Sequence, residues 1–273
     1  MLELLSEHAC FGGVQRFYRH ASSAIGLPMR FSVFLPPAQG RGAEPIPALV
    51  YLAGLTCTEE TFMIKAGAQR LAAEHGIALL APDTSPRGAN LPGEADSWDF
   101  GVGAGFYLDA TEAPWSKHYR MESYVTGELV PLAQAAFGLD VSRTGIFGHS
   151  MGGHGALVLA LRHPGLFASV SAFAPIAAPT QCPWGVKAFS GYLGANRQRW
   201  QNHDASALMA GMEKPYADGI LIDQGLADQF LAEQLHPEQF EAACARAGQP
   251  LTLRRHAGYD HGYYFISTFM ADH

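Results

Sequence analysis

A serine flanked by glycines, between a strand pattern and a helix pattern, constrains the fold of this chain most strongly. The run Arg143–Phe147 favours a strand, Gly148-His149-Ser150-Met151-Gly152 follows it, and Ala156–Arg162 favours a helix. Glycines two residues before and after the serine allow a turn too tight for neighbouring side chains, so the pattern predicts a nucleophile elbow that points Ser150 toward substrate. The alternative is a glycine-rich helix start that binds a phosphate or packs on a sheet.

The acid of a catalytic triad should follow the serine in the chain. A serine hydroxyl needs a base and an orienting acid, and after an elbow of this kind they come in the order Ser, Asp or Glu, His. Gly219–Gly225 has the pattern of a buried strand, and Asp228 lies in the loop directly after it. We therefore predict Asp228 as the acid. Asp223 is the rival, although its place at the strand end favours a carboxylate tied to nearby groups, and Glu233 fits the following helix.

The base is selected from the four histidines that follow Asp228. His236 precedes a proline and fits a helix entrance, His256 ends a strand pattern, and His273 is the last residue and is expected to fray. His261 lies in a loop between that strand and the apolar helix Tyr263–Met270. Because loops at strand ends collect catalytic groups on a rigid scaffold, His261 is the predicted base.

Two backbone N–H groups should stabilise the negative charge that develops on the carbonyl oxygen. Met151 directly follows the nucleophile and supplies the first. The strand pattern Pro47–Ala53 runs into a glycine turn, so the backbone N–H of Leu55 is the candidate for the second. An ordinary strand-to-loop turn is the equal alternative for Leu55.

Length and composition fit one α/β domain that covers residues 1–273. Of the 273 residues 48% are hydrophobic and only 16% are charged, which is enough for a large core. After a hairpin-like start, strand and helix patterns alternate, which predicts a mostly parallel sheet with helices on both faces. Two aromatic stretches, Pro82–Lys117 and Pro175–Asn202, are expected to be loops that cover the site. The helices expected earlier in the chain include Thr61–Glu74 and Met121–Ala136.

Charge and cysteine usage exclude several classes of partner. The net charge is −7, from 18 basic and 25 acidic residues without a basic run, so neither nucleic acid nor an anionic membrane is an expected partner. No leader or membrane-spanning pattern is found, which favours an intracellular protein. The four cysteines show no metal or disulfide spacing, and no phosphate loop or dinucleotide motif is present. We expect no metal and no cofactor.

Six segments together resemble S-formylglutathione hydrolases, also called the esterase D family, over essentially the whole chain. Each motif is weak alone, but six in the family's order are specific. They are Gly54-Leu55-Thr56-Cys57-Thr58, the run Ser97–Tyr107, the elbow Gly148–Gly155, Cys182-Pro183-Trp184-Gly185, Asp223-Gln224-Gly225 and Gly258-Tyr259-Asp260-His261.

The resemblance implies an α/β-hydrolase fold and the same triad, Ser150, Asp228 and His261, and it favours Leu55 and Met151 as oxyanion donors. It also implies hydrolysis of S-formylglutathione to formate and glutathione in formaldehyde detoxification, by a metal-free, cytoplasmic homodimer. A general carboxylesterase, of the acetyl or feruloyl type, is the alternative. Two features depart from the family: Gly262 stands where serine is expected, and relatives commonly continue beyond His273.

The small formyl group suggests a narrow acyl pocket. Trp98, Phe100 and Trp184 are candidate walls, although ordinary packing is an equal alternative for these aromatic residues. Cys57 is expected to border the site, with a buried and inert thiol as the commoner outcome. Glutathione is anionic and suggests a nearby cation, for which the sequence does not rank Lys65, Arg87, Lys117 and Lys187.

Overall fold

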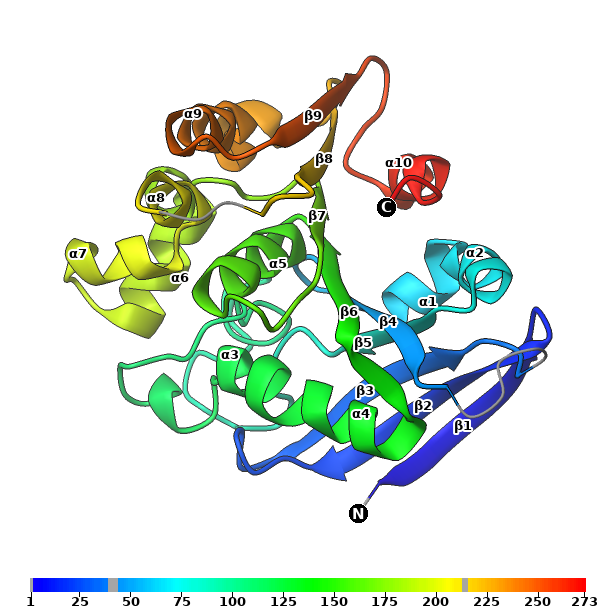
Figure 1. Cartoon of the computed structure of the whole chain (residues 1–273). Helices are drawn as coiled ribbons and strands as arrows, with labels where there is room; N and C mark the ends of the chain where they lie inside the picture. Colours follow the sequence, from blue (N-terminus) through cyan, green and yellow to red (C-terminus); the bar gives the residue numbers. More distant parts are fainter. Residues whose placement is uncertain (1, 39–43, 213–215) are drawn as a thin grey trace.

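The computed structural model describes residues 2–38, 44–212 and 216–273. In these residues nine strands form one sheet in the order β1-β2-β3-β5-β4-β6-β7-β8-β9 (Figure 1). The strands are β1 (Glu3–Cys10), β2 (Gly13–Ala21), β3 (Pro28–Leu35), β4 (Ile46–Leu52), β5 (Ala78–Pro82), β6 (Leu139–His149), β7 (Val170–Phe173), β8 (Ile220–Gly225) and β9 (Leu251–His256). Strands β1 to β3 pair antiparallel with one another and β3 pairs antiparallel with β5, whereas β4 to β9 pair in parallel. The predicted mostly parallel sheet is confirmed.

Helices cover both faces of this sheet. The α-helices are α1 (Thr61–Lys65), α2 (Ala68–His75), α3 (Met121–Ser123), α4 (Val130–Phe137), α5 (Met151–Arg162), α6 (Pro183–Leu193), α7 (Arg197–Trp200), α8 (Ala205–Ala210), α9 (Pro237–Ala247) and α10 (Tyr263–Phe269). Helices α1, α2 and α10 lie on one side, and α4, α5, α8 and α9 lie on the other (Figure 1). We infer one α/β domain, because a single cluster of buried apolar residues extends from Phe17 to Met270.

The helix expected over Thr61–Glu74 is two helices, so that prediction was wrong in detail. Helix α1 ends at Lys65, and Gly67 adopts a left-handed conformation with φ of 66° before α2 begins. A residue without Cβ takes this conformation at no steric cost, so Gly67 allows the chain to turn between the two short helices. The expected Met121–Ala136 helix is present as α3, a π-helical stretch over Tyr124–Leu129 and α4.

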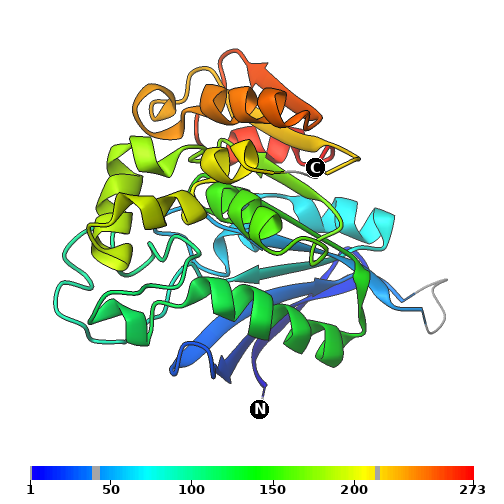
Figure 2. The ribbon, with the colours of Figure 1, turned by 60° about the vertical axis from the view of Figure 1, so that its left-hand side comes forward.

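The two long aromatic stretches differ from each other. Pro175–Asn202 was expected to be loop, but it contains α6 and α7. Pro82–Lys117 is loop, apart from one 3₁₀ turn at Trp115–Lys117 and isolated bridges. Figure 2 shows that this loop runs beside α6 and α7. The N–H of Thr111 donates to the carbonyl of Tyr192 at 2.7 Å and joins the two segments.

The carboxyl ends of β4, β6, β8 and β9 lie at one edge of the sheet, because these strands are parallel neighbours or near neighbours. The loops after them carry Gly54, Ser150, Asp228 and His261, respectively. In open parallel sheets this edge is where ligands bind. The topology therefore brings together four segments that are far apart in the sequence.

Membrane crossing requires a long apolar helix, and no helix among the described residues meets that requirement.

Candidate active site

Ser150 occupies a strained turn between β6 and α5. Its φ and ψ angles are 58° and −120°, a conformation that few residues other than glycine adopt, and its N–H donates to the carbonyl of Phe173 at 3.0 Å. Ser150 is 3% exposed. Strain of this kind persists only where surrounding contacts enforce it, and it is typical of a nucleophile at an elbow.

Close backbone contacts explain the two glycines around Ser150. A Cβ at Gly152 would collide with the carbonyl oxygen of Leu52, and a Cβ at Gly148 would collide with the carbonyl oxygen of Gly152. The elbow therefore packs directly against the end of β4, and any side chain at either position would push it away.

Asp228 and His261 form a hydrogen-bonded pair. His261 Nδ1 lies 2.5 Å from Asp228 Oδ2, and the other carboxylate oxygen accepts the N–H of Phe230 at 2.8 Å. The Gln224 amide also donates to Asp228 Oδ2, at 3.3 Å. The Asp228 side chain is fully buried and that of His261 is 15% exposed. An acid held in this way fixes the tautomer and the orientation of the imidazole.

Two rings that the sequence analysis did not select contact His261. The ring of His149 packs on it at 4.3 Å between centroids, and Phe230 meets it edge-on at 5.1 Å. Burial, reinforced by the charge of His261, holds the pKa of His149 well below its usual range. His149 therefore stays neutral. In the sequence, His149 could have been identified because it directly precedes Ser150. Phe230 could have been identified because it lies two residues after Asp228.

The contact with His149 brings His261 to the residue next to the serine. The Ser150 hydroxyl makes no hydrogen bond to another described residue. In ligand-free enzymes the bond between nucleophile and base is often long, and it tightens when substrate binds.

The two predicted oxyanion donors belong to segments that adjoin Ser150. Met151 is the first residue of α5, and an N–H in the first turn of a helix has no acceptor within the helix. Leu55 follows Gly54, where a Cβ would lie 3.2 Å from the Ser150 Cβ. The turn that carries the Leu55 N–H therefore borders Ser150.

Cys57 continues this turn and is half-buried. Burial raises the pKa of its thiol, although hydrogen bonds with Thr61 and Tyr263 lower it in part. Tyr263 also packs near His149, with 6.2 Å between ring centroids. Cys57 therefore contacts Tyr263, whose ring lies near His149, the residue before Ser150.

The three candidate aromatic walls occupy different places. Trp184 packs on Phe230 at 4.8 Å, and Phe230 in turn contacts His261. Trp98 is 55% exposed and meets Trp184 edge-on. Phe100 instead belongs to a cluster in which it stacks on Tyr192 at 4.6 Å and meets Trp115 edge-on. Trp184 and Trp98 thus continue a row of rings that begins at His261 and Phe230, whereas Phe100 packs between the long loop and α6.

Asp223, the rival acid, is fully buried in a different network. Its carboxylate accepts two hydrogen bonds from Arg254, and it also bonds His256 at 2.8 Å and His273 at 2.9 Å. His273 additionally bonds the Ser171 hydroxyl. The expectation that His273 frays was therefore wrong, because its side chain is buried and held by two strands.

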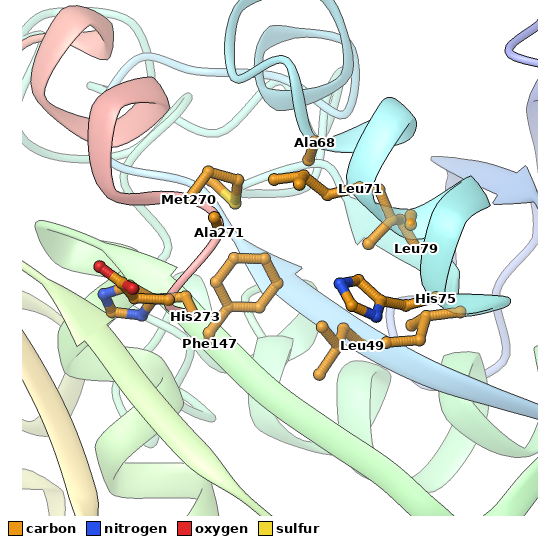
Figure 3. A pocket seen from close by; sticks show the side chains of 12 residues that line it. Leu49, Ala68, Leu71, His75, Leu79, Phe147, Met270, Ala271 and His273 are labelled. Atoms are coloured by element: carbon orange, nitrogen blue, oxygen red, sulfur yellow. The ribbon is translucent and has the colours of Figure 1, made fainter.

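A surface hollow of about 370 Å³ lies beside His261, and Phe230, Asp260 and neighbouring loop residues also line it. A separate apolar hollow between α2 and the residues after α10 holds His75 and His273, but neither Ser150 nor His261 (Figure 3). Within the described residues, no cluster of three or more His, Cys, Asp or Glu side chains is arranged to hold a metal ion.

Comparison with known proteins gives consistent results. A family model described as a putative esterase matches residues 22–273. The S-formylglutathione hydrolase of Rattus norvegicus is 54% identical over 100% of this chain and 96% of its own length, and that of Bos taurus is 52% identical with the same coverage.

Solved structures agree with these relatives. An S-formylglutathione hydrolase from Agrobacterium tumefaciens has a TM-score of 0.94 at 50% identity, covering 99% of this chain and 96% of that chain. A ferulic acid esterase has a TM-score of 0.73 at 18% identity, covering 96% of each chain, and this likeness concerns the fold alone. The chain therefore has an α/β-hydrolase fold and belongs to the S-formylglutathione hydrolase family of esterases.

Proposed function

We propose that this chain is a serine thioesterase that hydrolyses S-formylglutathione to formate and glutathione. The observation that carries the proposal is the full-length identity of 52–54% to S-formylglutathione hydrolases, combined with a buried Asp228–His261 pair beside the elbow at Ser150. The substrate is proposed from the similarity to these relatives, and the mechanism is proposed from the geometry of the site.

Ser150 acts as the nucleophile. His261 Nε2 takes the proton of the hydroxyl as Oγ attacks the formyl carbon, while Asp228 holds Nδ1 and stabilises the imidazolium. The tetrahedral intermediate collapses, the C–S bond breaks, and the proton on His261 passes to the leaving glutathione sulfur. Water then attacks the formyl-serine ester with His261 as base, and formate is released.

The backbone N–H groups of Met151 and Leu55 stabilise the negative oxygen in both steps. One such donor contributes about 3 to 4 kcal/mol of transition-state stabilisation. The thiolate leaves readily, so the enzyme mainly has to deliver the nucleophile and hold the oxyanion. A neutral His149 favours this mechanism, because a second positive ring beside His261 would repel its imidazolium form.

A comparison of kcat/KM tests the substrate. We expect S-formylglutathione to be preferred over S-acetylglutathione and over nitrophenyl acetate. A strong preference for oxygen esters would instead identify a general carboxylesterase, which shares the fold and the nucleophile. The homodimer and the cytoplasmic location stay predictions from the family resemblance, and gel filtration of the purified protein tests the first.

A further inference from the structure

A second, strongly polar hollow lies at the carboxyl end of β5. Its volume is about 530 Å³, and both acidic and basic side chains line it, among them Arg30, Glu59, Asp83 and Arg87. None of the residues assigned to the catalytic triad or the oxyanion hole lines this hollow. A hollow with both signs of charge suits a ligand that carries both signs.

Glu59 is the unexplained group in this hollow. It is only 3% exposed, and its carboxylate accepts a hydrogen bond from its own backbone N–H but none from another described residue. The nearest cation is Arg30, whose Nη1 lies 4.0 Å from Oε1. Burial, and secondarily Asp83, raises the pKa of Glu59 to about 7. A buried carboxylate without a close cation is costly, and such groups cluster at functional sites.

The arginines around the hollow differ in whether they are already paired with a carboxylate or can bind a ligand. Arg87 is committed, because it forms a two-pronged pair with Asp83 at 2.7 and 2.9 Å. Arg19 is bound to Glu3 in the same manner. Arg30 is 52% exposed and has only the long contact to Glu59. Arg30 can therefore turn to an anionic group while Glu59 receives a cationic one.

The hollow is linked to the nucleophile through one short loop. Gly54 packs against Ser150, and Glu59 follows five residues later, so the chain between them spans at most about 18 Å. The Cys57 carbonyl in that loop accepts hydrogen bonds from Thr84 Oγ1 at 2.6 Å and from Arg87 Nη2 at 3.1 Å. These hydrogen bonds hold the loop in position between Ser150 and the polar hollow. The γ-glutamyl arm of glutathione extends about 8 to 10 Å from its sulfur, the length of two to three residues.

We propose that this hollow is a subsite for an α-amino-acid group, in which Glu59 binds the ammonium and Arg30 binds the carboxylate. It rests on the proposed function, under which the group is the γ-glutamyl end of the glutathione moiety. The thioester then lies at Ser150, and the glutathione arm runs along the loop that carries Leu55 and Cys57. Ion pairing at the far end of the substrate orients the thioester without touching the reacting atoms.

Isothermal titration calorimetry with free glutathione measures this binding without any turnover. We expect the Kd to rise about tenfold or more in Glu59→Gln and in Arg30→Gln, since a charge-assisted hydrogen bond is lost in each. In the wild type, glutaryl-cysteinylglycine, which lacks the ammonium, should bind about tenfold more weakly than glutathione. In Glu59→Gln the two ligands should bind equally.

The exposed pair Arg70 and Glu74 provides matched controls of the same residue types outside the hollow. Arg70→Gln and Glu74→Gln should leave the Kd of glutathione unchanged. Lys65→Gln tests the rival cation, which lies near Tyr263. Thermal unfolding of each variant shows that it is folded.

The proposal is overturned if Glu59→Gln binds glutathione as tightly as the wild type, if it still prefers glutathione to the analogue, or if only Lys65→Gln weakens binding. Wild-type protein that shows no glutathione binding overturns it as well. Failure of the proposed function looks different, because the wild type would then hydrolyse nitrophenyl acetate but not S-formylglutathione.

Discussion

Asp228 Oδ2 and His261 Nδ1 lie 2.5 Å apart, across the loops that follow the neighbouring parallel strands β8 and β9. Because Asp228 is fully buried and also accepts the N–H of Phe230, its carboxylate is fixed before substrate arrives. The pair is therefore preorganised to hold the imidazole in the tautomer that accepts a proton at Nε2.

Replacing Asp228 by asparagine should preserve the shape of the pair but lose the charge that stabilises the imidazolium. We expect kcat for S-formylglutathione to fall by about 10⁴-fold. The double variant with His261→Ala should be little worse than His261→Ala alone, because the triad acts as a unit. Asp260→Asn, an exposed neighbour of His261, serves as the control and should keep nearly full activity. Additive losses in the double variant would contradict the assigned roles.

Replacing Glu59 by glutamine should stabilise the free protein at neutral pH. The pKa of Glu59 is about 7 in the folded protein, above its value in the unfolded chain, so the folded state holds the proton more tightly. Stability of the wild type therefore decreases as pH rises from about 4.5 to 7, and glutamine removes this loss. The charged groups facing Glu59 are Asp83, Arg30, Glu60 and Arg87, and all remain in the variant.

Thermal unfolding of wild type and Glu59→Gln between pH 4.5 and 8 measures this effect. The variant should gain Tm over the wild type as pH rises and keep the gain above pH 7. A variant that is less stable at pH 8 would show that the Glu59 carboxylate has a structural role.

Replacing Asp223 by asparagine should destabilise the fold without changing the chemistry. Burial alone would raise the pKa of Asp223, but hydrogen bonds from His273, Arg254 and His256 hold it well below its usual range. The stabilisation that ionised Asp223 gives the folded protein is present above about pH 4, the pKa of an aspartate in the unfolded chain. It is lost as the pH falls through the lower pKa that Asp223 has in the folded protein. We expect a loss of about 3 kcal/mol at pH 7 in urea unfolding.

Asp272→Asn is the matched control for Asp223, because Asp272 is an exposed partner of the same Arg254 at 2.9 Å. An exposed pair of this kind contributes about 1 kcal/mol or less. Equal losses in the two variants would argue that burial of the Asp223 network contributes nothing.

Replacing Gly262 by serine should give a small gain in stability. Gly262 is the N-cap of α10, with an extended backbone at φ −88° and ψ 177°, and serine at this position can accept a hydrogen bond from the first turn. We expect the free energy of unfolding to increase by about a few tenths of a kcal/mol, which would be measured as a slight rise in Tm. A Cβ there would lie 3.1 Å from Asp260 Oδ1, so that carboxylate must shift. A fall in Tm would mean that this contact outweighs the cap.

The sequence predicts the tight turn at Ser150 and the proximity of Asp228 to His261 well, because they depend on local spacing and chain order. Gly148 and Gly152 mark a turn that only glycine permits, and Asp228 and His261 each follow a recognisable strand. These signals can be recognised from local spacing, although the contact that requires glycine at Gly152 is made with Leu52 of β4. The assignment of Asp223 to a network of its own follows from the same position at a strand end.

Other features depend on tertiary contacts that spacing does not encode. The proline and glycine of Cys182-Pro183-Trp184-Gly185 suggest a loop, but proline is favoured in the first turn of a helix, and the Cys182 side chain caps α6. Phe100 and Trp184 are similar in sequence context, and only the packing partners separate them. His273 is held because Ser171 and Asp223 lie within its reach.

Turnover of S-formylglutathione by Ser150→Ala and by Cys57→Ala tests the central claim most directly, because Ser150 is the proposed nucleophile and Cys57 is a second nucleophilic side chain, three residues after Gly54. The account predicts that Ser150→Ala loses about 10⁴-fold or more of kcat, whereas Cys57→Ala keeps turnover close to the wild type. Folded Ser150→Ala protein that retains turnover, with the loss found in Cys57→Ala instead, would contradict it.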